Sequence, residues 1–73
     1  MYRRIRDLRE DKDLTQAQIA NLLYIDQTTY SRYELGKLNI PCAVLIKLAQ
    51  YYNVSVDYLL GLTNETTPYR RIQ

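Results

Sequence analysis

The stretch from Leu14 to Gly36 constrains the fold of this chain more than any other part of the sequence. Thr15 is a good helix N-cap with Gln18 three residues later, and apolar residues at 19, 20 and 23 follow at helical spacing. After a short break, Asp26 offers a carboxylate that can cap a second helix. The stretch therefore predicts two short helices joined by a tight turn.

The second of these helices carries an unusual outward face. Tyr30 and Tyr33 lie three residues apart and can both face inward. The polar residues that then face outward together are Gln27, Thr28, Ser31 and Arg32. A solvated helix face is more usually rich in Glu and Lys, whereas Gln, Thr and Arg are side chains that pair with base edges in a major groove. This face is suited to reading hydrogen-bonding groups.

The motifs TQAQIA at 15–20, Ile25, YSRYELGK at 30–37, Pro41 and LIKLAQYYNVSVDYLLG at 45–61 resemble one known family. The sequence is similar to the helix-turn-helix of Cro and phage repressors, the xenobiotic-response-element type of bacterial regulator, over about Ile5 to Gly61. The resemblance implies an all-α fold, a compact five-helix bundle like the DNA-binding domain of lambda repressor. It also implies a sequence-specific transcriptional regulator, most often a repressor, whose third helix at about 27–35 enters the major groove of double-stranded DNA.

The resemblance implies roles for individual residues. The positions that match the base-reading residues of the family are Gln27, Thr28 and Arg32, with Ser31 beside them. The positions that match phosphate contacts are Thr15 and Gln16 at the start of the second helix, and Lys37 and Asn39 in the loop after the third. Arg9 would pair with Glu34 and tie the third helix to the first; a free phosphate contact is the alternative for Arg9, and a helix cap is the alternative for Asn39.

Helical periodicity extends on both sides of this motif. A first helix at 2–12 would bury Ile5 and Leu8, with Asp7 and Asp11 able to pair with Arg3 and Arg4. A fourth helix at 41–52 would bury Leu45, Leu48, Ala49 and Tyr52. A fifth helix after the N-cap Ser55 would bury Val56, Leu59 and Leu60 and would end at Gly61. Asp13 and Asn53 are expected to adopt left-handed conformations between helices.

Two residues depart from the family pattern. Tyr24 stands where glycine is most usual in the turn, so either it accepts a positive φ at a cost on the order of 1 kcal/mol or the turn differs. Asp26 replaces a more usual Ser or Thr, and its negative charge should weaken phosphate binding unless it points away.

Length and composition bound the remaining possibilities. The 73 residues suffice for one domain, which we place at 1–62, followed by a polar tail at 63–73. The tail is interpreted as frayed or as an arm that uses Tyr69, Arg70 and Arg71. A single cysteine, Cys42, a charged N-terminus and the lack of any long apolar run predict a cytoplasmic protein. The family resemblance implies a bacterial or phage origin. The net charge of only +2 is weak evidence for nucleic acid.

One protomer presents one short reading helix, so specific binding predicts a homodimer on a palindromic operator with half-sites ~34 Å apart. The exposed apolar residues expected to form the two-fold contact are Ile46, Tyr51, Tyr58 and Leu62.

An enzyme is not expected, because the chain has no histidine and nothing to activate its one cysteine or its serines. The same composition leaves no ligand set for zinc, and no cofactor is expected. The remaining alternative is a protein-interaction module of the same fold, such as an antitoxin or an adaptor. A protein-binding third helix would carry apolar anchors, whereas this one is polar.

Overall fold

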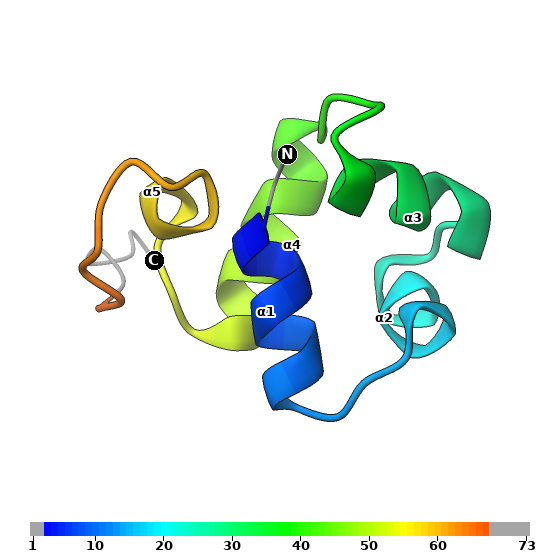
Figure 1. Cartoon of the computed structure of the whole chain (residues 1–73), viewed down its shortest axis with the longest axis horizontal. Coiled ribbons are helices and arrows are strands. Elements are labelled where there is room, and N and C mark those ends of the chain that lie inside the picture. The colour runs from blue at the N-terminus through cyan, green and yellow to red at the C-terminus, as the bar shows by residue number, and fades with distance from the viewer. Residues whose placement is uncertain (1–2, 68–73) are drawn as a thin grey trace.

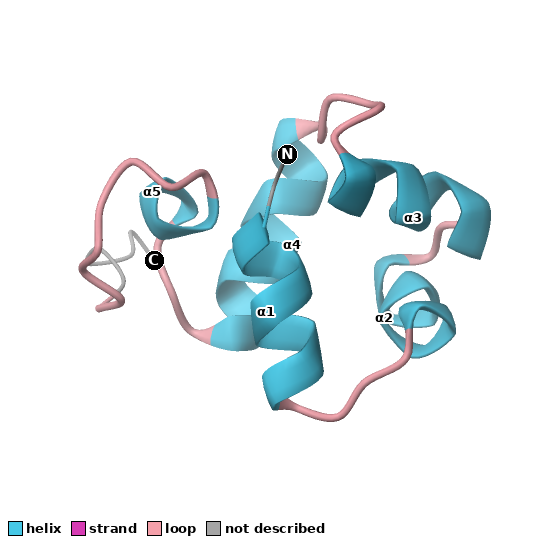
Figure 2. Cartoon of the chain, in the orientation of Figure 1, coloured by secondary structure: helices cyan, strands magenta, loops and turns pink. Residues whose placement is uncertain are grey.

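The computed structural model describes residues 3–67, and these residues form five helices connected by short loops (Figures 1 and 2). The helices are α1 (Arg3–Asp11), α2 (Gln16–Leu23), α3 (Gln27–Leu35), α4 (Cys42–Tyr52) and α5 (Val56–Leu59). In Figure 1, α1 lies in front of α4 at the centre, with α5 on one side and the α2–α3 pair on the other. The all-α fold with a helix-turn-helix predicted from the sequence is confirmed.

Side-chain caps fix where three of the helices start. Thr15 and Gln18 form a complete capping box at α2, in which each side chain bonds the other residue's backbone N–H. Asp26 Oδ1 accepts from the Thr29 backbone N–H at 2.7 Å and starts α3, and Ser55 Oγ does the same for α5 with Tyr58. Local sequence therefore determines where α2, α3 and α5 begin.

The core draws one completely buried side chain from every helix. These five side chains are Ile5, Ile19, Tyr30, Leu48 and Leu59, in chain order from α1 to α5. The other predicted core residues of α2 and α4 are buried around them, namely Ala20, Leu23, Leu45, Ala49 and Tyr52. All five helices thus share a single hydrophobic centre.

Among residues 3–67, three residues other than glycine have a positive φ, and all three lie at turns between helices. Asp13, Tyr24 and Asn53 have φ values of 55°, 57° and 56°. Asp and Asn tolerate this left-handed conformation better than most residues do. Tyr24 therefore adopts the first of the two expected alternatives: the turn is of the usual kind, and a bulky residue accepts the strain.

The structure corrects two details of helix boundaries and burial. Pro41 is the N-cap of α4 and not its first helical residue. Leu60, expected in the core, is 36% exposed, because α5 ends after four residues and Leu60 already lies in the turn that leads to Gly61. Tyr2 lies outside the described residues, so the start of the predicted first helix is not compared.

Arg4 does not form the predicted pair with an aspartate of its own helix. Its guanidinium instead donates hydrogen bonds to the Tyr58 carbonyl at 3.1 Å, to the Thr63 carbonyl and to Asn64 Oδ1 at 2.8 Å. The same group lies 4.1 Å from the centre of the Tyr58 ring. Arg4 therefore attaches the segment after α5 to α1, while Tyr69, Arg70 and Arg71 of the predicted arm lie outside the described residues.

Within residues 3–67, no helix combines the length and apolar character that crossing a lipid bilayer requires.

Candidate nucleic-acid interface

The outward face of α3 lines a shallow hollow of about 510 Å³. Its lining residues are Gln27, Thr28, Ser31, Arg32 and Leu35 of α3, together with Gln16 of α2 and Lys37 of the following loop. Gln27, Thr28 and Arg32 are exposed and Ser31 is half-buried. The structure thus brings all four predicted base-reading residues together with two of the predicted phosphate contacts.

The opposite face of α3 holds this helix against the rest of the molecule. Tyr30, Tyr33 and Glu34 are the buried residues of α3. Glu34 is only 5% exposed, and its carboxylate forms an ion pair with Arg9 of α1, with 2.7 Å between Arg9 Nε and Glu34 Oε2. A buried carboxylate requires such a partner, so the pair fixes α3 to α1.

Each of the three guanidinium nitrogens of Arg9 donates a hydrogen bond within the protomer. Besides Nε, its Nη2 donates to Glu34 Oε1 at 3.2 Å and its Nη1 donates to the Leu14 carbonyl at 2.8 Å. Of the two alternatives for Arg9, this geometry matches the structural pair and not the free phosphate contact.

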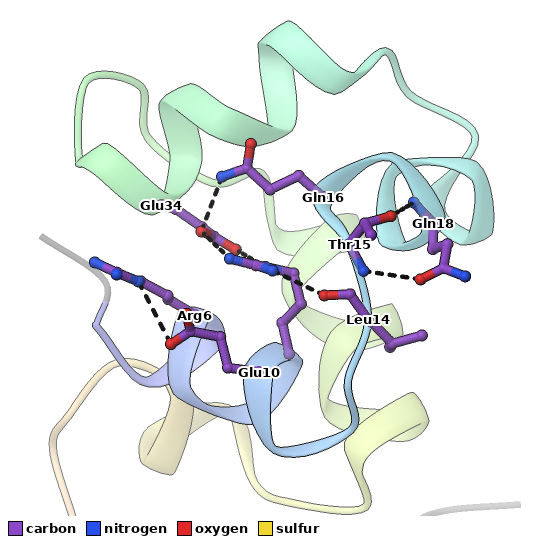
Figure 3. A network of polar contacts seen from close by, with 8 residues as sticks. Arg6, Glu10, Leu14, Thr15, Gln16, Gln18 and Glu34 are labelled. Atoms are coloured by element: carbon purple, nitrogen blue, oxygen red, sulfur yellow. Dashed lines mark hydrogen bonds and ion pairs between the residues drawn. The ribbon is translucent and has the colours of Figure 1, made fainter.

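Gln16 is held by the same carboxylate. Its Nε2 donates to Glu34 Oε1 at 3.1 Å, a contact drawn in Figure 3 beside the capping box of Thr15 and Gln18. An amide nitrogen carries two hydrogens, so the second can still donate to a phosphate. Glu34 thereby holds the Gln16 side chain at the start of α2.

The capping box occupies some of the hydrogen-bond donors at the start of α2 and leaves others available to a phosphate. The Thr15 backbone N–H donates to Gln18 Oε1 at 2.8 Å, and the Thr15 hydroxyl oxygen accepts from the Gln18 N–H at 3.1 Å. The backbone N–H groups at the first positions of the helix, Gln16 and Ala17, have no acceptor within the helix. These two amides and the Thr15 hydroxyl hydrogen are the donors left for an anion.

Two carboxylates near the interface remain ionised. Burial raises the pKa of Glu34, but the hydrogen bonds from Arg9 and Gln16 and the charge of Arg9 outweigh it, and the net pKa is lowered. The backbone N–H of Thr29 lowers the pKa of Asp26. Because the Asp26 carboxylate is held by the N-terminus of α3, its charge is offset there by the helix dipole.

The loop after α3 places its two candidate phosphate contacts differently. Gly36, at φ 75°, ends the helix, and the Lys37 backbone N–H donates to the Arg32 carbonyl at 2.9 Å. Lys37 is exposed and lines the hollow. Asn39 is also exposed but is not among the lining residues.

Leu35 is a residue at this surface that sequence reasoning missed. It is 54% exposed and also lines a second hollow of about 400 Å³ between α1 and α3, which shares Gln16 and Ser31 with the first. Leu35 lies four residues after Ser31 and eight after Gln27, and this spacing could have identified it. An apolar side chain here can contact a thymine methyl group.

The four predicted dimer contacts do not form one patch. Ile46 and Tyr51 are 51% and 44% exposed, but five residues on a helix turn the side chain by about 140°, so they lie on different faces of α4. Tyr58 is half-buried beneath the Arg4 guanidinium. Leu62 is 72% exposed. Of the four, Ile46 and Leu62 are therefore the exposed residues whose side chains do not contact a cation among the described residues.

Comparison with known proteins gives a consistent result. The helix-turn-helix family profile matches residues 5–59. YobD of Bacillus subtilis (strain 168), an uncharacterized HTH-type transcriptional regulator, is 42% identical over 69 residues, which are 93% of this chain and 62% of YobD. The transcriptional repressor RstR of the cryptic phage CTXphi in Vibrio cholerae is 37% identical over 58 residues, 80% of this chain and 52% of RstR.

A more distant match bears on the alternative function. The antitoxin PezA of Streptococcus pneumoniae serotype 4 (strain ATCC BAA-334 / TIGR4) is 33% identical over 57 residues, 78% of this chain and 36% of PezA. This chain thus spans between about a third and two thirds of the length of these relatives. No solved structure matches the chain. The matched profile covers every helix from Ile5 to Leu59, and the chain belongs to the helix-turn-helix family, of the xenobiotic-response-element type.

Proposed function

We propose that this protein binds double-stranded DNA at a specific operator and represses transcription there. In this proposal α3 enters the major groove, with Gln27, Thr28, Ser31 and Arg32 toward base edges and Leu35 available to a thymine methyl. Gln16, Thr15, Lys37 and Asn39 hold the phosphates on either side. Such contacts position the protein, while the base contacts give it sequence preference.

The observation that carries the proposal is that α3 has a buried inner face and an outward polar face. The inner face of α3 is fixed by the buried Tyr30, Tyr33 and Glu34, whereas its outer face presents polar side chains over a hollow that Gln16 and Lys37 also line. A rigid helix with an exposed polar face is what reading base edges requires. The names of YobD and RstR, a transcriptional regulator and a transcriptional repressor, support the same function.

A single α3 gives a small interface, so the proposal includes a homodimer on a palindromic operator. Ile46 and Leu62 are the apolar residues that we assign to the contact between protomers. We place the DNA-binding unit at residues 1–62 and its site of action in the cytoplasm, where the operator is.

The experiment that tests the function is selection of bound duplexes from a random DNA pool at near-physiological salt. A palindrome with half-sites one helical turn apart is the expected product. Retention without enrichment, which disappears as salt is raised, would show only non-specific attraction to phosphates and would overturn the proposal.

Arg32→Ala should weaken binding to the selected operator and relax the preference at one base position. A bidentate arginine contact with guanine provides about 1–3 kcal/mol of discrimination. Gln16→Ala is the matched variant, because loss of a phosphate contact should weaken all sequences alike. Competition binding against single-base operator variants measures both effects, and an unchanged preference in Arg32→Ala would remove Arg32 from the reading face.

The similarity to PezA supports a second candidate, a module that binds a protein with this same face. A protein-binding α3 would show apolar anchors, but Leu35 is the one apolar side chain among the lining residues of the α3 hollow. Two results together would favour this candidate. The selection experiment would enrich no DNA sequence, and the protein would bind a defined partner protein that the Arg32→Ala variant does not bind.

A further inference from the structure

A third hollow, a groove between α2 and α4, has lining residues distinct from those of both hollows beside α3. It has a volume of about 330 Å³ and is lined by Ile19, Leu22, Leu23, Lys47, Gln50 and Tyr51. Ile19 and Leu23 are buried, whereas Leu22 and Tyr51 are 48% and 44% exposed. We refer to it as the α2–α4 groove. Its apolar floor and half-exposed apolar walls resemble a site into which another side chain can insert.

Tyr24 extends the apolar surface at one end of this groove. Its ring is 89% exposed, and Lys47 Nζ lies 5.4 Å from the ring centre, which connects Tyr24 to the lining residues. Tyr24 also has a φ of 57°, a conformation that costs a residue with a side chain on the order of 1 kcal/mol. Apart from the contact with Lys47, the side chain is largely open to solvent and gains little packing within the protomer. An exposed tyrosine in such a position is typical of a contact with another molecule.

Lys47 is the one charged residue among those that line the α2–α4 groove. The sequences of α2 and α4, QAQIANLL and CAVLIKLAQYY, contain Lys47 and no acidic residue. Lys12 adds a second cation, 5.9 Å from the Tyr51 ring, although Asp11 and Asp13 flank it in the sequence. The acid closest in sequence to Tyr24 is Asp26, whose carboxylate caps α3. A ligand that complements this surface must combine apolar side chains with negative charge.

We propose that the α2–α4 groove docks an amphipathic helix of another protein, with leucine-sized residues inserted beside Leu22, Tyr24 and Tyr51 and with Asp or Glu facing Lys47. An amphipathic helix suits this groove, because it can lay its apolar face against the apolar lining while its charged face meets Lys47 at the edge. The groove shares no lining residue with the α3 hollow, so the proposal does not depend on the DNA-binding function. It makes this chain able to hold DNA and a protein at the same time.

The test uses a fluorescent helical peptide of about 15 residues, with leucines on one face and glutamates on the other, and a control peptide in which lysines replace the glutamates. Fluorescence anisotropy with the full chain should show binding of the acidic peptide and at least about tenfold weaker binding of the basic one. Adding a DNA duplex should leave binding of the acidic peptide unchanged.

Matched variants locate the site. Lys47→Glu reverses the charge of the groove, and Tyr24→Ala removes the ring without changing the Cβ; each should weaken acidic-peptide binding about tenfold or more. Ile46→Ala removes an exposed apolar side chain on another face of α4, and Lys37→Glu makes the same charge change beside α3. Both should bind the acidic peptide as the unchanged protein does.

Three results of the peptide experiment would overturn the proposal. These are no binding of the acidic peptide up to about 1 mM, equal binding of the acidic and basic peptides, and equal weakening by Lys37→Glu and Lys47→Glu. Circular dichroism of each variant separates loss of the groove from loss of the fold. A self-association that Tyr24→Ala abolishes would assign the groove to a second copy of this chain instead of another protein.

Discussion

Tyr24 adopts a backbone conformation that is unfavourable for tyrosine, because the turn it forms requires a positive φ. The turn between α2 and α3 needs a positive φ, which glycine adopts without cost and tyrosine does not. Tyr24→Gly should therefore raise the free energy of unfolding, by about 0.5–1 kcal/mol after the greater flexibility of glycine in the unfolded chain is subtracted. Urea denaturation monitored by circular dichroism measures the change.

The control for that prediction is Tyr24→Ala, which keeps the Cβ and its strain while removing the ring. It should give no gain in stability. If alanine stabilises the domain as much as glycine does, the gain comes from removing the ring and the turn is not strained.

Tyr52 carries a buried hydroxyl for which the described residues provide no hydrogen-bond partner. Tyr52→Phe removes this group and should leave stability unchanged or raise it by up to about 1 kcal/mol. Burial also raises the pKa of the Tyr52 hydroxyl to about 12, from 10. Because the unfolded chain ionises first, stability should fall as pH rises between these values, and Tyr52→Phe should remove that part of the loss.

Thermal unfolding across the alkaline range measures both effects. Tyr51→Phe is the comparison, since Tyr51 is 44% exposed and its hydroxyl is not among the buried unpaired groups. A clear destabilisation by Tyr52→Phe at neutral pH would mean that the hydroxyl is bonded in solution.

Contacts between residues near in sequence could be predicted from local patterns, and contacts between distant residues could not. The Arg9–Glu34 pair, 25 residues apart, was predicted only through the family resemblance. The caps Thr15, Asp26 and Ser55 bond groups three residues away, so the sequence alone identified them. Arg4 bonds groups 54 to 60 residues away. No local pattern marks such a contact, so the sequence favoured the nearer aspartates instead.

At the scale of one element, α3 depends on the Glu34 carboxylate. This group accepts from Arg9 and Gln16, and these bonds outweigh burial to lower its pKa. A group whose pKa is lowered by folding adds stability above its unfolded value, here 4.5, and that stability is lost as pH falls further. The domain should therefore lose stability below about pH 4.5.

Glu34→Gln should reduce the loss of stability that occurs below about pH 4.5. It should also lower the free energy of unfolding at neutral pH by up to about 3 kcal/mol, because Arg9 would lose its counter-charge. Denaturation at a series of pH values tests this. Glu10→Gln is the control, since the Arg6–Glu10 pair is exposed and 3.6 Å apart, and little change is expected. If Glu34→Gln and the unchanged protein lose the same stability as pH falls, the role given to Glu34 is wrong.

Helices of different length were predictable to different degrees. In α4, eleven residues repeat the apolar spacing often enough to fix which face is buried. In α5, four residues make about one turn, so periodicity could not show that Leu60 already lies beyond the helix.

For the whole molecule, the fold and the outward polar face of α3 followed from the sequence, whereas the grouping of other exposed residues did not. Ile46 and Tyr51 are both apolar and close in sequence, yet they lie on different sides of α4. Only the three-dimensional structure, in which residues of α2 and α4 line one groove, shows that Tyr51 belongs to it. Surface patches depend on several elements at once, which a single-helix pattern does not describe.

If Ile46 contributes to the contact between protomers, Ile46→Glu should reduce cooperative binding to the selected palindrome by about tenfold or more while leaving affinity for an isolated half-site nearly unchanged. Lys47→Glu, one residue away on α4, should leave that cooperativity intact. Titration of full and half operators measures both. Equal cooperativity in Ile46→Glu and the unchanged protein would place the dimer contact elsewhere.

The shared centre of the core has a consequence for how long each copy of this protein lasts. Every helix supplies one completely buried side chain to that centre. If one helix detached from the core, the buried side chains of the other four helices would become exposed to water. A cellular protease would then meet either the intact domain or the unfolded chain, with few partly open forms between them. The lifetime of each copy would follow the unfolding equilibrium, so a change of a few kcal/mol anywhere in the core would change how much of this protein is present.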